Sequence, residues 1–237
     1  MLGVAPRHRE PSNPLPPGFT SNDDVQIDHE TVLPNLPCHW FRNILPLSAQ
    51  ASLFDFLKQH DRTDWENLPK CMNPSPKTLQ LGVTGGVAAP VLTFNFRETM
   101  TTAYTAPHSF VLCVADHLRR LSLLPSTSSP TSFSLAVIRY QSPNGKFPRH
   151  VDHCNDRSLV FLFSLGNSCL FRVAHSQERE IVMRSGDVMV FDPSTEAGVE
   201  HEVKGVVEGS CPLELAEMFE EECGRFRYGI QCRVHFE

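Results

Sequence analysis

The feature that most constrains the fold of this chain is a change of hydrophobic periodicity near Phe133. From there on, the sequence contains seven short runs with the composition of β-strands, each bounded by turn residues. The runs are SFSLAVIRY, SLVFLFSL, CLFRV, EIVM, DVMVF, HEV and FRYGIQCRVHF. So many short strands in one continuous segment predict a β-sandwich or β-barrel over residues 131–237.

Two helices are expected before this β region. Ser48 occupies an N-cap position, and apolar residues follow it at helical spacing. These apolar residues are Ala49, Leu53, Phe56 and Leu57. A second predicted helix begins near Pro107 and carries Phe110, Val114, Leu118 and Leu121 on one face. Helices that precede the strands should pack on the outside of the barrel, which gives a mainly β fold with flanking helices, an α+β chain.

Composition divides the chain into three parts. Residues 1–24 contain five prolines by position 17 and few apolar residues, which predicts a disordered Pro-rich tail. Residues 25–130 are expected to form a helical and substrate-lid region, and residues 131–237 the β domain. Within the β domain, an acidic insert at 205–224 holds six glutamates and no Lys or Arg, and its PLELAEMFEEE core reads as a helix.

Charge and cysteine content restrict the class of protein. The chain has 21 Lys+Arg against 27 Asp+Glu, and this net charge of −6 argues against a dedicated duplex-DNA binder. No apolar run approaches the roughly 20 residues of a membrane helix, and the N-terminus lacks the apolar core of a secretory signal. The eight cysteines form no C-x-x-C pair, so we expect free thiols in a reducing compartment. We therefore expect an intracellular monomer, cytoplasmic or nuclear, without a membrane segment, and an organelle address stays open.

The strongest chemical signal is the tripeptide HVD at 150–152. His150 and Asp152 are two residues apart, so on a strand both side chains would point to the same face. His201, which opens the run HEV, is a candidate third ligand. Two histidines and one carboxylate on one face of an octahedron leave open positions, as non-haem Fe(II) oxygenases require. A structural or surface H-x-D pair is the alternative, and a zinc site would lack any recognised ligand pairing around His153, Cys154 and Cys169.

The last predicted strand carries arginines at alternate positions. Arg225, Arg227 and Arg233 would share one face of a regular strand. An inward-facing arginine is costly to bury unless it meets an anion, and a planar guanidinium suits a carboxylate. In the alternative register the arginines face solvent, and the core face consists of Tyr228, Ile230 and Cys232.

Four stretches together resemble the AlkB-like branch of the Fe(II)/2-oxoglutarate dioxygenases. In chain order they are VIRYQSPNGKFPRHVD, LFSLGNSCLFRV, MRSGDVMVFDPSTEAGVEHEV and RYGIQCR, the last of which opens and closes with the arginines of R-x5-R. The resemblance covers residues 131–237. It implies a double-stranded β-helix, or jelly-roll, and a dioxygenase that uses Fe(II), 2-oxoglutarate and O₂.

Carried over residue by residue, the resemblance implies roles for six side chains. His150, Asp152 and His201 would hold the catalytic iron, and Arg227 and Tyr140 would bind the distal carboxylate of 2-oxoglutarate. Arg233 would serve the other carboxylate or a neighbouring substrate contact. Arg225 has no counterpart in the family and is the alternative to Arg227.

The sequence also departs from the family pattern. Ile138 and Gly229 stand where the family often has asparagine, and Cys154 stands where nucleotide-repair members carry an acid. The lid segment KTLQLGVTGG has one lysine and no aromatic ring, although Trp65, Phe94 and Phe96 could stack a base if they are not core residues. In prolyl-hydroxylase-like enzymes a basic residue follows the second histidine by about ten positions, where this chain has Cys211 and Pro212.

The resemblance implies hydroxylation of a C–H bond with release of succinate and CO₂. If the carbon is an N-methyl group, the outcome is demethylation. The substrate would be a methylated nucleic acid, a protein or a small molecule. The alternatives are a protein hydroxylase of the same superfamily and a catalytically silent double-stranded β-helix that serves as a binding module.

Overall fold

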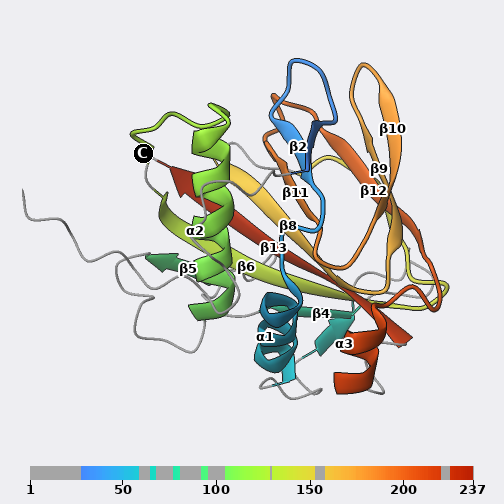
Figure 1. The fold of residues 1–237 in the computed structure, drawn as a ribbon. Helices are drawn as coiled ribbons and strands as arrows, with labels where there is room; N and C mark the ends of the chain where they lie inside the picture. The colour runs from blue at the N-terminus through green and yellow to red at the C-terminus, as the bar shows by residue number, and fades with distance from the viewer. Residues whose placement is uncertain are drawn as a thin grey trace, which may run out of the picture.

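The computed structural model describes residues 28–58, 65–67, 77–80, 92–95, 105–128, 130–152, 158–219 and 225–236. The predicted tail at 1–24 lies outside these ranges. In Figure 1 the structure consists of two sheets, with helices on the outer side of the larger one.

Eight strands form the two facing sheets of the core. The larger sheet contains the order β11-β8-β13-β6, and the smaller sheet has the order β10-β9-β12-β7. Their bounds are β6 Pro130–Gln141, β7 Phe147–His150, β8 Ser158–Gly166, β9 Cys169–Ala174, β10 Glu178–Met183, β11 Val188–Phe191, β12 Glu200–Val206 and β13 Phe226–Phe236. Neighbouring strands are antiparallel, and the chain passes repeatedly from one sheet to the other. This is the double-stranded β-helix predicted from the sequence.

The region before residue 131 adds strands that the sequence analysis did not anticipate. They are β1 His29–Thr31, β2 Cys38–Phe41, β3 Trp65–Asn67, β4 Lys77–Gln80 and β5 Leu92–Asn95. β2 pairs with β11 at one edge of the larger sheet, and β4 and β5 both pair with β6 towards the other. Each strand has only three or four residues, which is too short to show an alternating pattern.

Both long helices lie close to their predicted positions. α1 spans Leu47–Lys58 and α2 spans Thr105–Arg120, and their apolar faces form one core with the larger sheet. The apolar residues predicted to face the core are buried at six positions, which are Ala49, Leu53, Leu57, Phe110, Val114 and Leu118. The side chain of Phe56 lies outside the described residues. Leu121 was expected on the buried face but is 39% exposed, because α2 ends at Arg120 and the chain turns away. No helix within the described ranges is long and apolar enough to cross a membrane.

The acidic insert contains the short helix α3, Leu213–Met218. It lies beside α1 in Figure 1 and buries Leu215. Just after it, Phe219 stacks on Phe54 of α1, with ring centroids 4.7 Å apart. The insert is therefore packed against the helical layer rather than fully solvated.

Strand β13 is buried on both faces. Tyr228, Ile230, Cys232 and Val234 belong to the core beneath the helices. The alternate residues face the space between the two sheets, and they are Arg227, Gly229, Gln231 and Arg233. There they contact buried residues such as Met183 and Tyr140, and Asp152 of the HVD segment. Each of the two alternatives for this strand is therefore partly correct. Arg227 faces inward, and Tyr228, Ile230 and Cys232 are also core residues, because the helices cover the face that would otherwise meet solvent.

Candidate functional site

Two histidines lie side by side on neighbouring strands of the smaller sheet. His150, the last residue of β7, lies opposite His201 of β12, and their ring centroids are 4.2 Å apart. Nδ1 of His150 is 2.9 Å from the carbonyl oxygen of Pro148, and Nδ1 of His201 is 3.2 Å from that of Val199. A carbonyl only accepts hydrogen bonds, so each Nδ1 is assigned as the N–H donor. Both Nε2 atoms are then left with the lone pair that a metal needs.

Asp152 completes the cluster, although it lies beyond the end of β7 rather than on a strand. Its Oδ1 is 3.5 Å from Nε2 of His150 and 3.9 Å from Nε2 of His201. One ligand atom from each of the three residues lies within 4.8 Å of the others. A divalent ion with bonds of about 2.0–2.2 Å to three ligands at right angles would draw these atoms to about 3 Å from one another.

The second oxygen of Asp152 has its own partners. Oδ2 accepts a hydrogen bond from Nη2 of Arg233 at 3.0 Å and a longer one from Nε2 of Gln231 at 3.4 Å. These contacts hold Oδ1 towards the histidines. Arg233 therefore contacts the proposed metal ligand through Nη2, while its Nε has no hydrogen-bond partner among the described residues. Gln231 belongs to no sequence motif, and its position two residues before Arg233 on the same face is the one signal that could have indicated its role.

The electrostatics suit a metal-binding cluster. Burial, together with the nearby His150, lowers the pKa of His201 to about 4, so this ring is neutral at pH 7. Burial acts the same way on His150, but hydrogen bonds to Asp152 and Pro148 outweigh it and raise the pKa of His150. Burial raises the pKa of Asp152, yet the hydrogen bond from His150 and the positive charge of Arg233 leave it lowered overall. The carboxylate is thus ionised at neutral pH.

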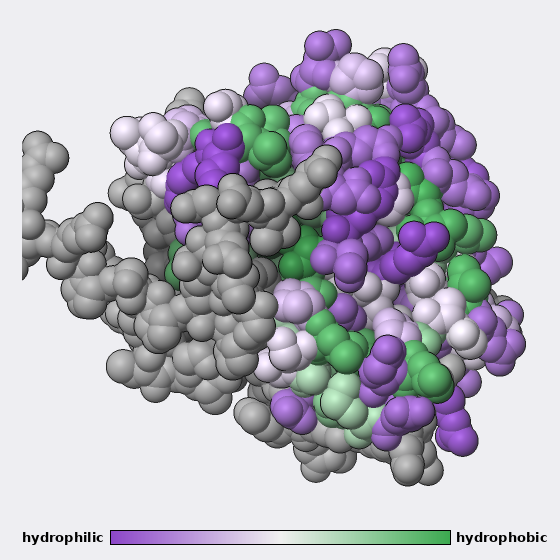
Figure 2. Space-filling view, viewed as in Figure 1, coloured by the Kyte–Doolittle hydropathy of each residue, from purple (hydrophilic) through white to green (hydrophobic). Residues whose placement is uncertain are grey.

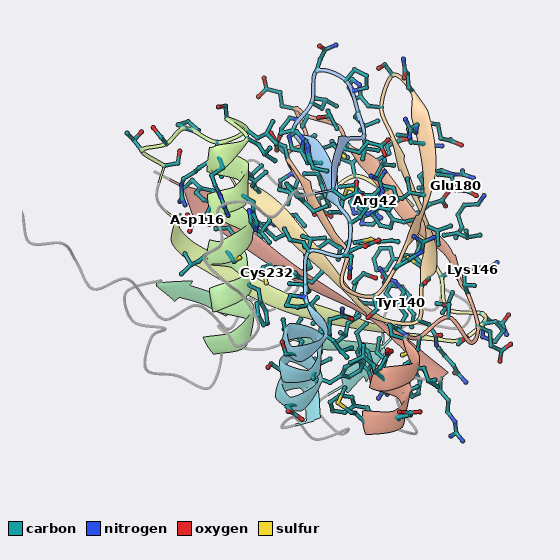
Figure 3. The ribbon with its side chains drawn as sticks, in the orientation of Figure 1. Arg42, Asp116, Tyr140, Lys146, Glu180 and Cys232 are labelled. Atoms are coloured by element: carbon teal, nitrogen blue, oxygen red, sulfur yellow. The ribbon has the colours of Figure 1, made fainter. Side chains whose placement is uncertain are left out.

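A buried arginine lies on the same face of β13. Arg227 is 0% exposed, and its guanidinium carbon is 5.1 Å from the ring centroid of Tyr140, its partner on β6. Nη2 is 3.9 Å from Sδ of Met183, and neither Nε nor Nη1 has a hydrogen-bond acceptor among the described residues. Burial raises the pKa of Tyr140 above its ordinary value, so its hydroxyl keeps its proton. Figure 3 shows Tyr140 between the ribbons of the two sheets.

The other candidate residues fall elsewhere. Arg225 is exposed, so it does not share the buried environment of Arg227. Cys169 lies next to Arg227 and outside the His–Asp–His group. His153, Cys154 and Phe96, and the side chains of Trp65 and Phe94, lie outside the described residues.

The outer face of the smaller sheet carries paired charges. Figure 2 shows a largely hydrophilic surface here, and Glu180 projects from the outer side of β10 in Figure 3. Arg149 and Glu200, the neighbours in sequence of the two histidines, form one ion pair. Further pairs are Arg149–Glu178, Arg172–Glu178, Arg172–Glu180, Arg172–Glu202 and Lys204–Glu180. This surface next to the cluster is therefore not a basic patch.

No protein-family model and no curated protein matches the sequence. Solved structures do match. OsALKBH1 is 16% identical with a TM-score of 0.54, over 85% of this chain and 98% of that one. A prolyl-4-hydroxylase from Pseudomonas putida is 15% identical with a TM-score of 0.52, over 85% and 93% of the two chains. A Trichoplax adhaerens prolyl hydroxylase, solved with a hypoxia inducible factor peptide fragment, is 15% identical with a TM-score of 0.52, over 84% of each chain. At these identities the matches establish a shared fold and confirm the predicted fold class.

Proposed function

We propose that this protein is an Fe(II)- and 2-oxoglutarate-dependent dioxygenase that hydroxylates a C–H bond, with succinate and CO₂ as coproducts. One observation supports this most strongly. The interior face of β13 carries the buried and incompletely hydrogen-bonded Arg227 near one end, while Gln231 and Arg233 further along the same face hold Asp152 beside two histidines. A metal cluster and an anion anchor on one face are what a metal-chelating dicarboxylate needs.

The donor set fits Fe(II). Two imidazole nitrogens and one carboxylate oxygen bind this ion while leaving positions for a cosubstrate and O₂. Bound Fe(II) would couple the oxidative decarboxylation of 2-oxoglutarate to oxidation of the substrate. In this protein His150, Asp152 and His201 would hold the ion, and the bond from Arg233 to Asp152 would keep the carboxylate oriented.

The surroundings of Arg227 fit the distal carboxylate of 2-oxoglutarate. A buried cation without an acceptor at two of its nitrogens is costly, and a carboxylate relieves that cost through charge-assisted hydrogen bonds. The protonated hydroxyl of Tyr140 would be a further donor. A silent binding module has no evident use for a buried guanidinium and a metal cluster together.

For the substrate, the described surface favours a protein or a small molecule over a nucleic acid. The ion pair Arg149–Glu200 flanks the two histidines, and Arg172 and Lys204 on the same sheet are also paired with glutamates. Nucleic-acid affinity depends on unpaired cations that can meet phosphates. Hydroxylation or demethylation of a protein or a small molecule is therefore the more strongly supported form of the reaction.

Succinate release tests the proposal. The full chain is incubated with Fe(II), ascorbate and 2-oxoglutarate under air, with no other substrate. We expect slow succinate formation that Asp152→Ala abolishes, and we expect the exposed-site variant Arg225→Ala to retain it. If the wild-type protein binds Fe(II) and 2-oxoglutarate but forms no more succinate than Asp152→Ala, the silent binding module is the better account.

A further inference from the structure

One position on the interior face of β13 has no side chain. Gly229 lies between Arg227 and Gln231, and so between the buried cation and the residue that contacts Asp152. Its φ is not in the left-handed region, unlike Gly166, Gly186, Gly198 and Gly209. The backbone at Gly229 therefore does not require glycine, and the reason for it lies in what surrounds the missing side chain.

A side chain at this position would meet the guanidinium. A Cβ added to Gly229 would lie 3.2 Å from Nη1 of Arg227, 3.5 Å from Cδ1 of Leu162 and 3.6 Å from Cε2 of Tyr140. The edge of the guanidinium thus rests against the backbone of its own strand. A β-carbon would require the guanidinium to give way by a few tenths of an ångström, because 3.2 Å is tighter than an ordinary contact, whereas the distances to Leu162 and Tyr140 are those of ordinary van der Waals contacts.

The guanidinium also meets two sulfur-containing residues. Met183 of β10 and Cys169 of β9 are partners in the antiparallel pair, and both are 0% exposed. Sδ of Met183 is 3.9 Å from Nη2 of Arg227. A thioether is only a weak acceptor, so this wall fixes the place of the guanidinium without neutralising its charge.

The position of the guanidinium in turn sets the length of the site. Arg227 and Gln231 are four residues apart on one strand, which separates their Cα atoms by about 13 Å. Gln231 marks the metal end, because it contacts Asp152. An acid that binds the metal at one end and Arg227 at the other must match the distance that remains between them.

We propose that Gly229, together with Met183 and Cys169, is a specificity-determining element that selects a five-carbon 2-oxo dicarboxylate by fixing the position of the Arg227 guanidinium. This inference rests on the proposed function. Gly229 and Met183 act here as positioning residues, through Arg227 and not through the metal. A change at either should alter which acid binds and how tightly, while leaving metal affinity unchanged.

Calorimetry under anaerobic conditions tests this on the full chain loaded with Mn(II). The ligands are oxaloacetate, 2-oxoglutarate and 2-oxoadipate, which have four, five and six carbons. The wild-type protein should prefer 2-oxoglutarate. Gly229→Ala should weaken 2-oxoglutarate binding about tenfold, the order expected for one methyl group too many in a packed site. The matched control is Gly205→Ala, where an added Cβ meets nothing within 4 Å, and it should bind as the wild type does.

Met183→Ala removes the wall behind the guanidinium. It should shift the preference from 2-oxoglutarate towards 2-oxoadipate by about tenfold, the usual worth of one methylene in a pocket. Met183→Leu, which keeps most of the volume, should retain the wild-type preference. Such a change of ligand ranking would not follow from a general loss of stability.

The outcomes separate the two proposals. If the wild-type protein binds Mn(II) but no 2-oxo acid, the proposed function fails and this inference fails with it. If the wild type binds 2-oxoglutarate, but Gly229→Ala and Met183→Ala show the wild-type affinity and ranking, only this inference is overturned. Tenfold effects in both variants, with unchanged Mn(II) affinity, support it.

Discussion

Arg233 donates a hydrogen bond of 3.0 Å to the oxygen of Asp152 that faces away from the two histidines. Arg233 is the second arginine of R-x5-R, and the first, Arg227, lies six residues earlier on the same face of β13. One strand thus supports both ends of the candidate site. Arg227 is buried near one end of this face, and Arg233 contacts Asp152 further along it.

Loss of Arg233 should weaken metal binding. In Arg233→Met, Oδ2 of Asp152 keeps only the longer contact to Gln231, so the carboxylate is less well oriented. Loss of such an outer partner typically lowers metal affinity about 10- to 100-fold. Titration with Co(II) or Mn(II) measures the effect, and the control is Arg225→Met, at an exposed position just before β13. Equal metal affinity in the two variants would show that Arg233 does not support the ligand.

Stability should fall in mild acid because of a histidine outside the metal cluster. Burial, and then the charge of His29, lowers the pKa of His39 to about 4, whereas the unfolded chain titrates near 6.5. Protons therefore bind the unfolded state first, and the stability contributed above pH 6.5 is lost as the pH falls towards 4. The loss should be on the order of 1–2 kcal/mol, allowing for partial solvent screening.

Urea unfolding of wild type and His39→Gln at pH 7 and pH 4.5 checks this. His39→Gln should show a smaller difference between the two pH values. A pH dependence identical to that of the wild type would mean that His39 is not the titrating group.

The packing of the acidic insert makes a prediction about stability. Phe54 is 2% exposed, stacks on Phe219 and meets the ring of Tyr228 edge-on at 5.8 Å, so it joins α1, the insert and β13. Phe54→Ala should lower the free energy of unfolding by about 3–5 kcal/mol, as for other large aromatic residues in cores. The exposed neighbour Asp55→Ala should change it little. A loss below about 1 kcal/mol in a denaturant titration of Phe54→Ala would contradict this packing, because large-to-small changes in cores cost more.

Much of the core fold could be predicted because its signals are local. The long runs that became β8 and β13 alternate or are continuously apolar, and α1 and α2 show helical spacing. β7 was missed because FPRH contains a proline and no apolar alternation. Leu121 was misplaced because helical spacing continues one residue past the end of α2.

Tertiary contacts explain what was missed in the site. Motif resemblance identified the residues that come together at the metal cluster, yet the partner of Arg233 is Asp152, some eighty residues earlier in the chain. The contact between Gln231 and Asp152 spans a similar distance along the chain. No local pattern reports such a pairing. The burial of both faces of β13 was likewise hidden, because it depends on helices placed over the sheet from the other half of the chain.

The central claim is that one acid bridges the metal cluster and Arg227, and 2-oxoglutarate binding to the full chain measured with and without Mn(II) tests it most directly. The account predicts binding that requires Mn(II), and a dissociation constant that rises by about two to four decades in Arg227→Ala, as expected when one partner of a buried charge pair is removed. Mn(II) affinity should stay near the wild-type value in that variant, and Arg225→Ala should bind 2-oxoglutarate normally. Binding that is independent of Mn(II), or equally tight in Arg227→Ala and wild type, would contradict the account.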